Sequence, residues 1–119
     1  MNIALIGGTH GNEPVGLEVM KLFKKSSKKY HNPFECFWAN PKAYELKRRY
    51  VDSDLNRAFG KNGQPSGYEK QRAAELKKQI QDSFDFSIDL HTTTSNMGLT
   101  AILNNTNPMT HKAAIFLKQ

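Results

Sequence analysis

Three side chains with the chemistry of metal ligands follow apolar segments of this sequence. His10 and Glu13 stand three residues apart in the stretch LIGGTHGNEPVG, and His91 ends the segment FDFSIDLH. Two imidazoles and one carboxylate are the ligand set of a catalytic zinc that keeps a fourth position open. If the two segments are neighbouring strands, these residues meet at one edge, because ligands in open α/β sheets bind beyond the carboxyl ends of strands. The sequence therefore predicts one metal ion per chain.

Each part of this predicted site also has a simpler interpretation. The glycine-rich turn at residues 7–11 could bind phosphate, but no Lys-Ser or Lys-Thr follows it and the G-x-G-x-x-G order is absent. A lone histidine at a strand end is more often a surface residue than a ligand, and we assign His31 and His111 to the surface. Asp89, two positions before His91, faces the same side of an extended strand. It could orient a ligand or contact a substrate.

A second stretch, RRYVDSDLNRAFG at residues 48–60, mixes arginines with aspartates outside any regular periodicity. Binding residues concentrate in such irregular segments, and an arginine fork binds a carboxylate through two hydrogen bonds. The arginines could equally pair with Asp52 and Asp54 in a surface network. The residue types alone leave these two interpretations evenly balanced.

Alternating strands and helices must position these residues. Apolar runs predict strands at 2–6, 34–39, 86–90 and 99–103, and helical spacing predicts helices at 13–25 and 68–82, a short helix near 43–48 and a last helix from residue 108. Turn residues mark the irregular region 40–67. The β-α-β order indicates one α/β domain with a largely parallel or mixed sheet and helices on both faces.

Composition and charge limit the function classes. No apolar run approaches the roughly 20 residues of a membrane-spanning helix, and no basic region precedes the apolar start. The single cysteine, Cys36, cannot form an internal disulfide, so we expect a cytoplasmic protein in which this thiol fills a small apolar position. The chain has 17 Lys and Arg against 11 Asp and Glu, a formal charge of +6. This charge suits a small anionic ligand, and no recognisable nucleic-acid motif accompanies it.

Four motifs, GGTHGNE, NPKA, RYVDSDLNR and DLHTTTSNMG, occur in an order and approximate spacing that resembles the aspartoacylase branch of the aspartoacylase/succinylglutamate desuccinylase family. The resemblance covers essentially the whole chain. It implies a fold like that of the zinc carboxypeptidases. It also implies that His10, Glu13 and His91 match the zinc ligands of the family.

The resemblance further implies hydrolysis of the amide bond of an N-acyl amino acid, such as N-acetyl-aspartate, to a carboxylate and a free amino acid. Arg49 matches the arginine that polarises the scissile carbonyl, while Asn56 and Arg57 match residues that hold the α-carboxylate of the substrate. Zinc lowers the pKa of water toward about 7, and arginine stabilises a developing oxyanion. Arg49 and Asp89 are accordingly the candidate catalytic residues of this chain.

By the same resemblance, residues 1–119 are the N-terminal part of a zinc-hydrolase catalytic domain. Family members are much longer, and their remaining residues complete the domain, add a smaller C-terminal domain and supply the general-base glutamate. We therefore expect this chain to be inactive alone and its uncovered sheet to favour self-association. Two other hypotheses are a non-catalytic short protein that binds a metal or an anion, and a basic nucleic-acid binder.

Overall fold

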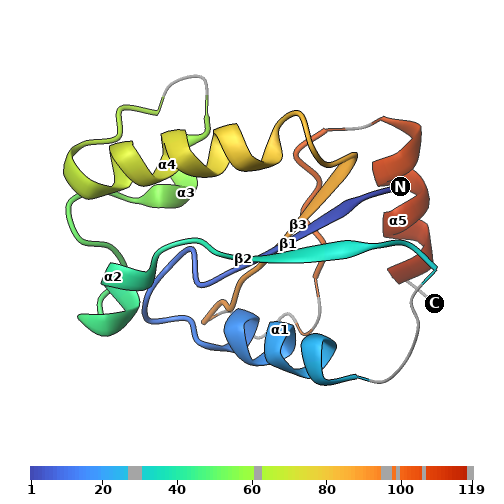
Figure 1. Cartoon of the computed structure of the whole chain (residues 1–119), viewed down its shortest axis with the longest axis horizontal. Coiled ribbons are helices and arrows are strands. Elements are labelled where there is room, and N and C mark those ends of the chain that lie inside the picture. The colour runs from blue at the N-terminus through green and yellow to red at the C-terminus, as the bar shows by residue number, and fades with distance from the viewer. Residues whose placement is uncertain (27–30, 61–62, 95–97, 99, 106, 118–119) are drawn as a thin grey trace.

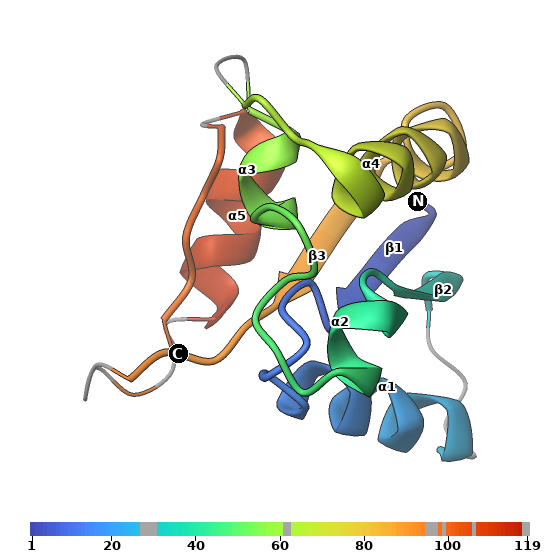
Figure 2. The ribbon, with the colours of Figure 1, turned by 90° about the vertical axis from the view of Figure 1, so that its left-hand side faces the viewer.

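The computed structural model describes residues 1–26, 31–60, 63–94, 98, 100–105 and 107–117. Its elements are β1 (Ile3–Gly7), α1 (Val15–Lys25), β2 (Phe34–Trp38), α2 (Pro41–Glu45), α3 (Leu55–Ala58), α4 (Gly67–Ile80), β3 (Phe86–Leu90) and α5 (Pro108–Leu117). The three strands form one parallel sheet in the order β2-β1-β3. Helix α1 lies on one face of this sheet, and α3 and α4 lie on the other (Figure 1; Figure 2). The predicted α/β class, the parallel sheet and the helices on both faces are confirmed.

The central strand β1 explains why helices cover both faces. Leu5 pairs with Cys36 of β2 on one side and with Ile88 of β3 on the other. The chain passes from β1 through α1 to β2 and then returns through α4, past β1, to β3. Crossovers between parallel strands are right-handed, so two crossovers in opposite directions place their helices on opposite faces. A strand covered in this way is apolar throughout, as the sequence IALIG is.

Two apolar clusters fill the interfaces between the helices and the sheet. The cluster beside α1 contains Leu5, Leu17 and Met20, and the cluster beside α3 and α4 contains Ala39, Leu55, Ala73 and Leu76. Successive residues of β1 serve opposite clusters, because Ile6 packs against the second. Burial of a leucine side chain contributes about 1.5–3 kcal/mol. The clusters therefore hold α1 on one face of the sheet and α3 and α4 on the other.

The turn after β1 depends on two glycines. Gly8 has a φ of 68°, in the left-handed region that residues with a Cβ seldom adopt. Gly11 lies so close to α2 that a Cβ would overlap the backbone carbonyl of Ala43. Its N–H also donates to the carbonyl oxygen of Arg49 at 3.1 Å. The turn is thereby pressed against α2 and the loop behind it, which fixes His10 between the two glycines.

Capping residues determine where the short helices α2 and α3 begin, and periodicity in the sequence did not predict these positions correctly. The helix predicted near 43–48 begins earlier, at Pro41, because the Asn40 side chain accepts a hydrogen bond from the Ala43 N–H and proline suits a first turn. Helix α3 was not predicted; Asp54 caps it by accepting from the Asn56 N–H. None of the described helices combines the length and apolar character needed to cross a bilayer.

The strand predicted at 99–103 is wrong for residues 100–103, which have no regular secondary structure; residue 99 lies outside the described residues. Ile102 is 85% exposed, so the apolar pattern of this segment does not reflect burial here. A strand needs a partner ladder, and in the described part of the chain the sheet consists of β2, β1 and β3 alone. Local composition cannot supply that partner.

A buried carboxylate joins α4 to the loop between α2 and α3. Glu69, in the first turn of α4, is 0% exposed. One of its oxygens accepts from the Asn40 side-chain amide at 3.0 Å and from the Val51 N–H at 2.7 Å. The other accepts from the N–H groups of Asp52 at 2.9 Å and Ser53 at 3.1 Å. Burial opposes ionisation of Glu69, but the four donors outweigh it and hold its pKa below the ordinary value.

We predict that Glu69 stabilises the fold at neutral pH and loses this effect in acid. Its folded pKa lies below an unfolded value of about 4.3, so the stabilisation is present above that pH and disappears as the pH falls through the folded pKa. Glu69→Gln should lower the unfolding free energy by about 2–4 kcal/mol near neutral pH, and by progressively less in acid. Urea unfolding across this range is the measurement. Glu45→Gln, at an exposed position of α2, is the control. A difference that stays constant with pH would contradict the prediction.

Candidate metal centre

The three predicted ligands meet at the carboxyl ends of two adjacent strands. Gly7 and Leu90 are register partners at the ends of β1 and β3. His91 follows β3 directly, while His10 and Glu13 occupy the turn that joins β1 to α1. One ligand atom from each of the three residues lies within 4.8 Å of the others. The parallel register thus brings together side chains that are about 80 positions apart in the sequence.

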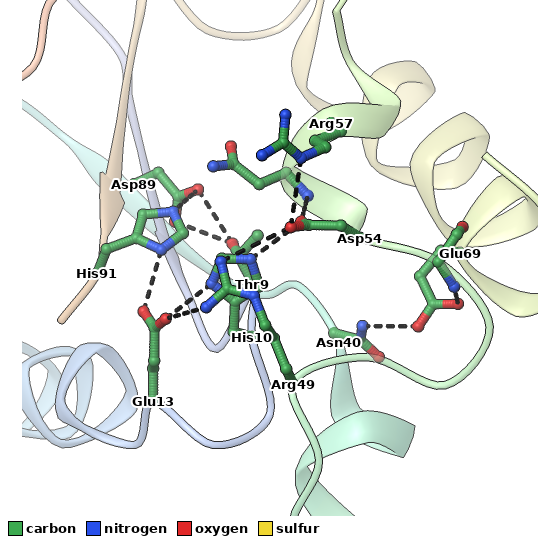
Figure 3. Close-up of polar contacts among 12 residues, drawn as sticks. Thr9, His10, Glu13, Asn40, Arg49, Asp54, Arg57, Glu69, Asp89 and His91 are labelled. Carbon is green, nitrogen blue, oxygen red and sulfur yellow. Dashed lines mark hydrogen bonds and ion pairs between the residues drawn. The ribbon is translucent and has the colours of Figure 1, made fainter. Parts of the chain in front are cut away.

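The carboxylate of Glu13 lies between the two imidazole rings (Figure 3). One oxygen is 2.8 Å from His10 Nδ1, and the other is 3.1 Å from His91 Nδ1. The second oxygen also accepts from the Thr92 N–H at 3.0 Å. Burial of Glu13 raises its pKa, but the Thr92 hydrogen bond, the charge of His10 and the two imidazole contacts outweigh burial and lower it. Glu13 is therefore an ionised acceptor toward which both Nδ1 atoms point.

An aspartate holds the other nitrogen of each ring. His10 Nε2 is 3.0 Å from Asp54 Oδ1, and His91 Nε2 is 2.8 Å from Asp89 Oδ2. Thr9 Oγ1 donates to Asp89 at 3.0 Å. The bond to Asp89 raises the pKa of His91, against the effect of burial. Metal-binding histidines are commonly held in this way. A carboxylate that accepts a hydrogen bond from one ring nitrogen fixes the orientation and tautomer of the ring, and the lone pair of the other nitrogen can then bind a metal.

The donor set fits a metal cation. Two ring nitrogens and one ionised carboxylate converge, and both rings are held from behind by carboxylates. Imidazole nitrogen and carboxylate oxygen are ligands that zinc accepts at catalytic sites. The carboxylates of Asp54 and Asp89, which contact the two rings, would offset the charge of a dication. The structure thus assembles the predicted ligands in an arrangement that could hold a metal ion.

The residues of the arginine-rich stretch lie at increasing distances from this centre. Arg49, with 49% of its side chain exposed, places one guanidinium nitrogen 3.3 Å from Glu13 and another 3.6 Å from Asp54. Arg57 is 85% exposed and approaches Asp54 at 3.8 Å. Asn56 is exposed and donates its backbone N–H to Asp54. The pairing of both arginines with Asp54, which itself contacts His10, agrees with the network interpretation of the stretch. The interpretation of the stretch as a ligand-binding segment stays a prediction.

Sequence reasoning missed the role of Asp54 and the presence of Thr9 beside the centre. Asp54 was assigned only to an arginine network, although it is 44 positions from the histidine that it contacts. No local pattern encodes such a pair; a capping aspartate before α3 was the one available signal. His31 and His111 are exposed, as predicted. Cys36 is half-buried, and burial raises the pKa of its thiol, in agreement with an apolar role.

Known proteins share this sequence and fold. Residues 1–118 match the family described as the succinylglutamate desuccinylase/aspartoacylase catalytic domain. A protein of Trichodesmium erythraeum named "Probable aspartoacylase" is 40% identical over 126 residues, which cover 97% of this chain and 43% of that protein. Rat aspartoacylase is 38% identical, with 87% of this chain and 38% of that protein covered.

Solved structures agree. Murine aminoacylase 3 superimposes with a TM-score of 0.58 at 31% identity, covering 76% of this chain and 35% of that chain. Succinylglutamate desuccinylase of Vibrio cholerae gives a TM-score of 0.65 at 23% identity, covering 76% and 30%, and shows likeness of fold. The chain spans less than half the length of the curated relatives above. The family match nevertheless includes every residue of the candidate centre, and the chain belongs to the succinylglutamate desuccinylase/aspartoacylase family.

Proposed function

We propose that this chain provides the metal-binding part of a zinc-dependent hydrolase that cleaves the amide bond of an N-acyl amino acid. The observation that carries the proposal is the convergence of His10, Glu13 and His91 at the ends of β1 and β3. Relatives named aspartoacylase and N-acyl-aromatic-L-amino acid amidohydrolase support the reaction class. The substrate class follows from those names and from the net charge of +6, which attracts anions.

Three side chains at the centre would bind the metal, and two aspartates would orient the histidine rings. His10 and His91 would offer Nδ1, because Asp54 and Asp89 favour the tautomer with the proton on Nε2. Glu13 would offer its carboxylate. When bound, zinc supplies a Lewis acid and lowers the pKa of water to about 7.

The arginines would bind and polarise the substrate. Arg49 borders the centre through Glu13 and Asp54 and has half of its side chain open to solvent, so it can turn toward a bound carbonyl. A cation there stabilises the oxyanion that develops when an amide is attacked. Arg57 lies farther out on α3 beside Asn56, where a guanidinium and an amide could hold the α-carboxylate.

We also propose that hydrolysis needs residues that the family carries beyond the length matched here. An amide leaving group must receive a proton, which requires a positioned acid or base. The carboxylates at the described centre are already engaged: Glu13 with both rings, and Asp54 and Asp89 with one ring each. The printed sequence has no Asp or Glu after Asp89. Metal binding without turnover is therefore the second candidate function for these 119 residues.

The metal assignment predicts one tightly held zinc per chain. Replacement of a ligand, His91→Ala, should reduce zinc affinity by at least about 100-fold, because loss of a group that merely orients a ligand already costs about 10- to 100-fold. His111→Ala removes an exposed histidine outside the centre and should change nothing. Zinc content after dialysis and competition with a chelating dye measure both variants. Unchanged affinity in His91→Ala would refute the assignment.

The arginine assignment predicts different kinetic losses. A chimera in which residues 1–119 replace the matching segment of the Trichodesmium relative provides an enzyme for this measurement. Arg49→Ala should lower kcat on N-acetyl-aspartate by roughly 100-fold or more, because it removes charge stabilisation that grows toward the transition state. Arg57→Ala should mainly raise KM. If Arg49→Ala kept a normal kcat, Arg49 would be a surface charge only.

The last prediction of this proposal compares the 119-residue chain with the chimera. With zinc present, the chain alone should release acetate from N-acetyl-aspartate no faster than a zinc-free control, because its described carboxylates near the metal are engaged. The chimera should turn over. Turnover by the chain alone at the rate of the chimera would show that a carboxylate such as Asp89 acts as the base.

A further inference from the structure

We propose that Glu69 is a positioning residue of the metal centre: from α4 it fixes the loop at residues 51–53, and through that loop it sets Asp54 and Arg49 against His10 and Glu13. The inference rests on the proposed function only in treating His10 and Glu13 as metal ligands. It adds a residue outside the centre on which the centre depends.

The first step is the contact between Glu69 and the loop. Three consecutive backbone N–H groups, those of Val51, Asp52 and Ser53, converge on the two oxygens of one carboxylate. Consecutive N–H groups aimed at one anion form a concave binding site in the backbone. Because Glu69 is fully buried, water does not compete for these bonds. The carboxylate therefore determines the path of the chain through the loop.

The second step runs from the loop to the centre. Asp54 follows the last anchored amide directly, and its carboxylate lies 3.0 Å from His10 Nε2. Arg49 precedes the first anchored amide by two residues and contacts Glu13 at 3.3 Å. Fixing residues 51–53 thus fixes the backbone position from which both flanking side chains reach the centre. In Figure 3, Glu69 lies on the far side of Asp54 from the two imidazole rings, and Asn40 lies below Asp54 and contacts Glu69.

The third step closes the network on the turn that carries His10. Asn40 donates its side-chain amide to Glu69, and its backbone N–H donates to the carbonyl oxygen of Gly8 at 3.0 Å. At the other end of the turn, the Gly11 N–H donates to the carbonyl oxygen of Arg49. The turn is therefore connected to Glu69 through Asn40 on one side of His10, and to Arg49, two residues before the anchored loop, on the other side.

Helix α4 is itself held against the sheet, and this fixes the position of Glu69. One turn after Glu69, Arg72 donates to the carbonyl oxygens of Trp38 at 2.7 Å and Ala39 at 2.8 Å, at the end of β2. Leu76, a further turn along, packs in the cluster beside α3 and α4. Glu69, Arg72 and Leu76 follow helical spacing along one side of α4, so the helix is held to the sheet along its length.

Substitution of Glu69 separates positioning from plain stabilisation. In Glu69→Gln one side-chain oxygen is replaced by an NH₂ group, so in either orientation the new donor faces at least one backbone N–H group. The loop should be released while the apolar contacts of α4 remain. Leu76→Ala is the matched control, because it weakens the same helix without touching the loop carboxylate. A residue that only stabilises the fold would resemble Leu76 in its effect on the folded chain.

The test measures zinc affinity of the whole chain by dye competition, at a temperature where every variant is folded. Glu69→Gln should bind zinc about 10-fold more weakly, at the low end of the roughly 10- to 100-fold cost of losing a group that contacts a ligand, because Glu69 acts through Asp54 and the loop. Glu69→Asp keeps the charge and should recover part of the loss, whereas Leu76→Ala should stay within about 2-fold of the original chain. In an Asp54→Ala background, Glu69→Gln should cost less affinity than it does in the original chain, because part of its effect passes through Asp54. Unchanged affinity in Glu69→Gln, or full additivity with Asp54→Ala, would overturn the proposal.

A second readout needs no metal. In the zinc-free chain, Glu69→Gln should speed hydrogen exchange at the amides of Val51, Asp52 and Ser53 by at least about 10-fold, and should shift the ring ¹⁵N resonances of His10 at constant pH. Leu76→Ala should leave the His10 resonances in place. If the original chain binds no zinc, the proposed function fails, and this readout still decides the role of Glu69. His10 resonances that do not move in Glu69→Gln would overturn it.

Discussion

The parallel pairing of β1 with β3 is the constraint on which the candidate centre depends. Its register places Gly7 opposite Leu90, so the residues that follow the two strands lie at the same edge of the sheet. A slip by one residue would turn every side chain of β3 to the opposite face and separate His91 from Glu13. The apolar clusters on both faces of β1 resist such a slip, because they fix which side chains point to which helix. Packing in the sheet thus provides the precision that the polar groups require.

Burial of the carboxylates in and beside this centre costs free energy. Carboxylates taken from water lose solvation, and each must recover it from hydrogen bonds or opposite charge. Glu13 does so between two imidazoles and Arg49, and Glu69 does so with four N–H donors. Among the described residues, no buried side-chain nitrogen or oxygen lacks a hydrogen-bond partner. The consequence is a connected network in which displacement of one group leaves another unpaired.

This network divides the chain into a scaffold and a set of groups open to solvent. The rings, Glu13 and the anchored loop are held on several sides, whereas Arg49 and Arg57 retain exposed guanidinium groups. Such a division suits binding chemistry, because a ligand can reach the exposed guanidinium groups while the groups that would hold a metal stay anchored by their other contacts. Membership of the succinylglutamate desuccinylase/aspartoacylase family is consistent with that division, and the chain carries it within less than half the length of its curated relatives.

Sequence alone determined the features that short-range patterns encode. Apolar runs and helical spacing located β1, β2, β3, α1 and α4 within a few residues, and the strand-end positions of His10, Glu13 and His91 identified them as a group. Four motifs in order also indicated the family, which the comparisons confirm. These inferences succeed because periodicity and spacing are local properties of the chain.

Tertiary structure alone decided which distant residues become partners. Asp54 contacts a histidine 44 positions away, and Glu69 anchors a loop 16 to 18 positions before it; neither pair has a periodic pattern. The segment at 100–103 shows the converse, since strand-like composition does not make a strand where no ladder forms. Contacts of this kind exist only after the sheet register and the helix packing have brought separate segments together, because hydrogen bonds and charges act over a few ångströms of space and not along the sequence.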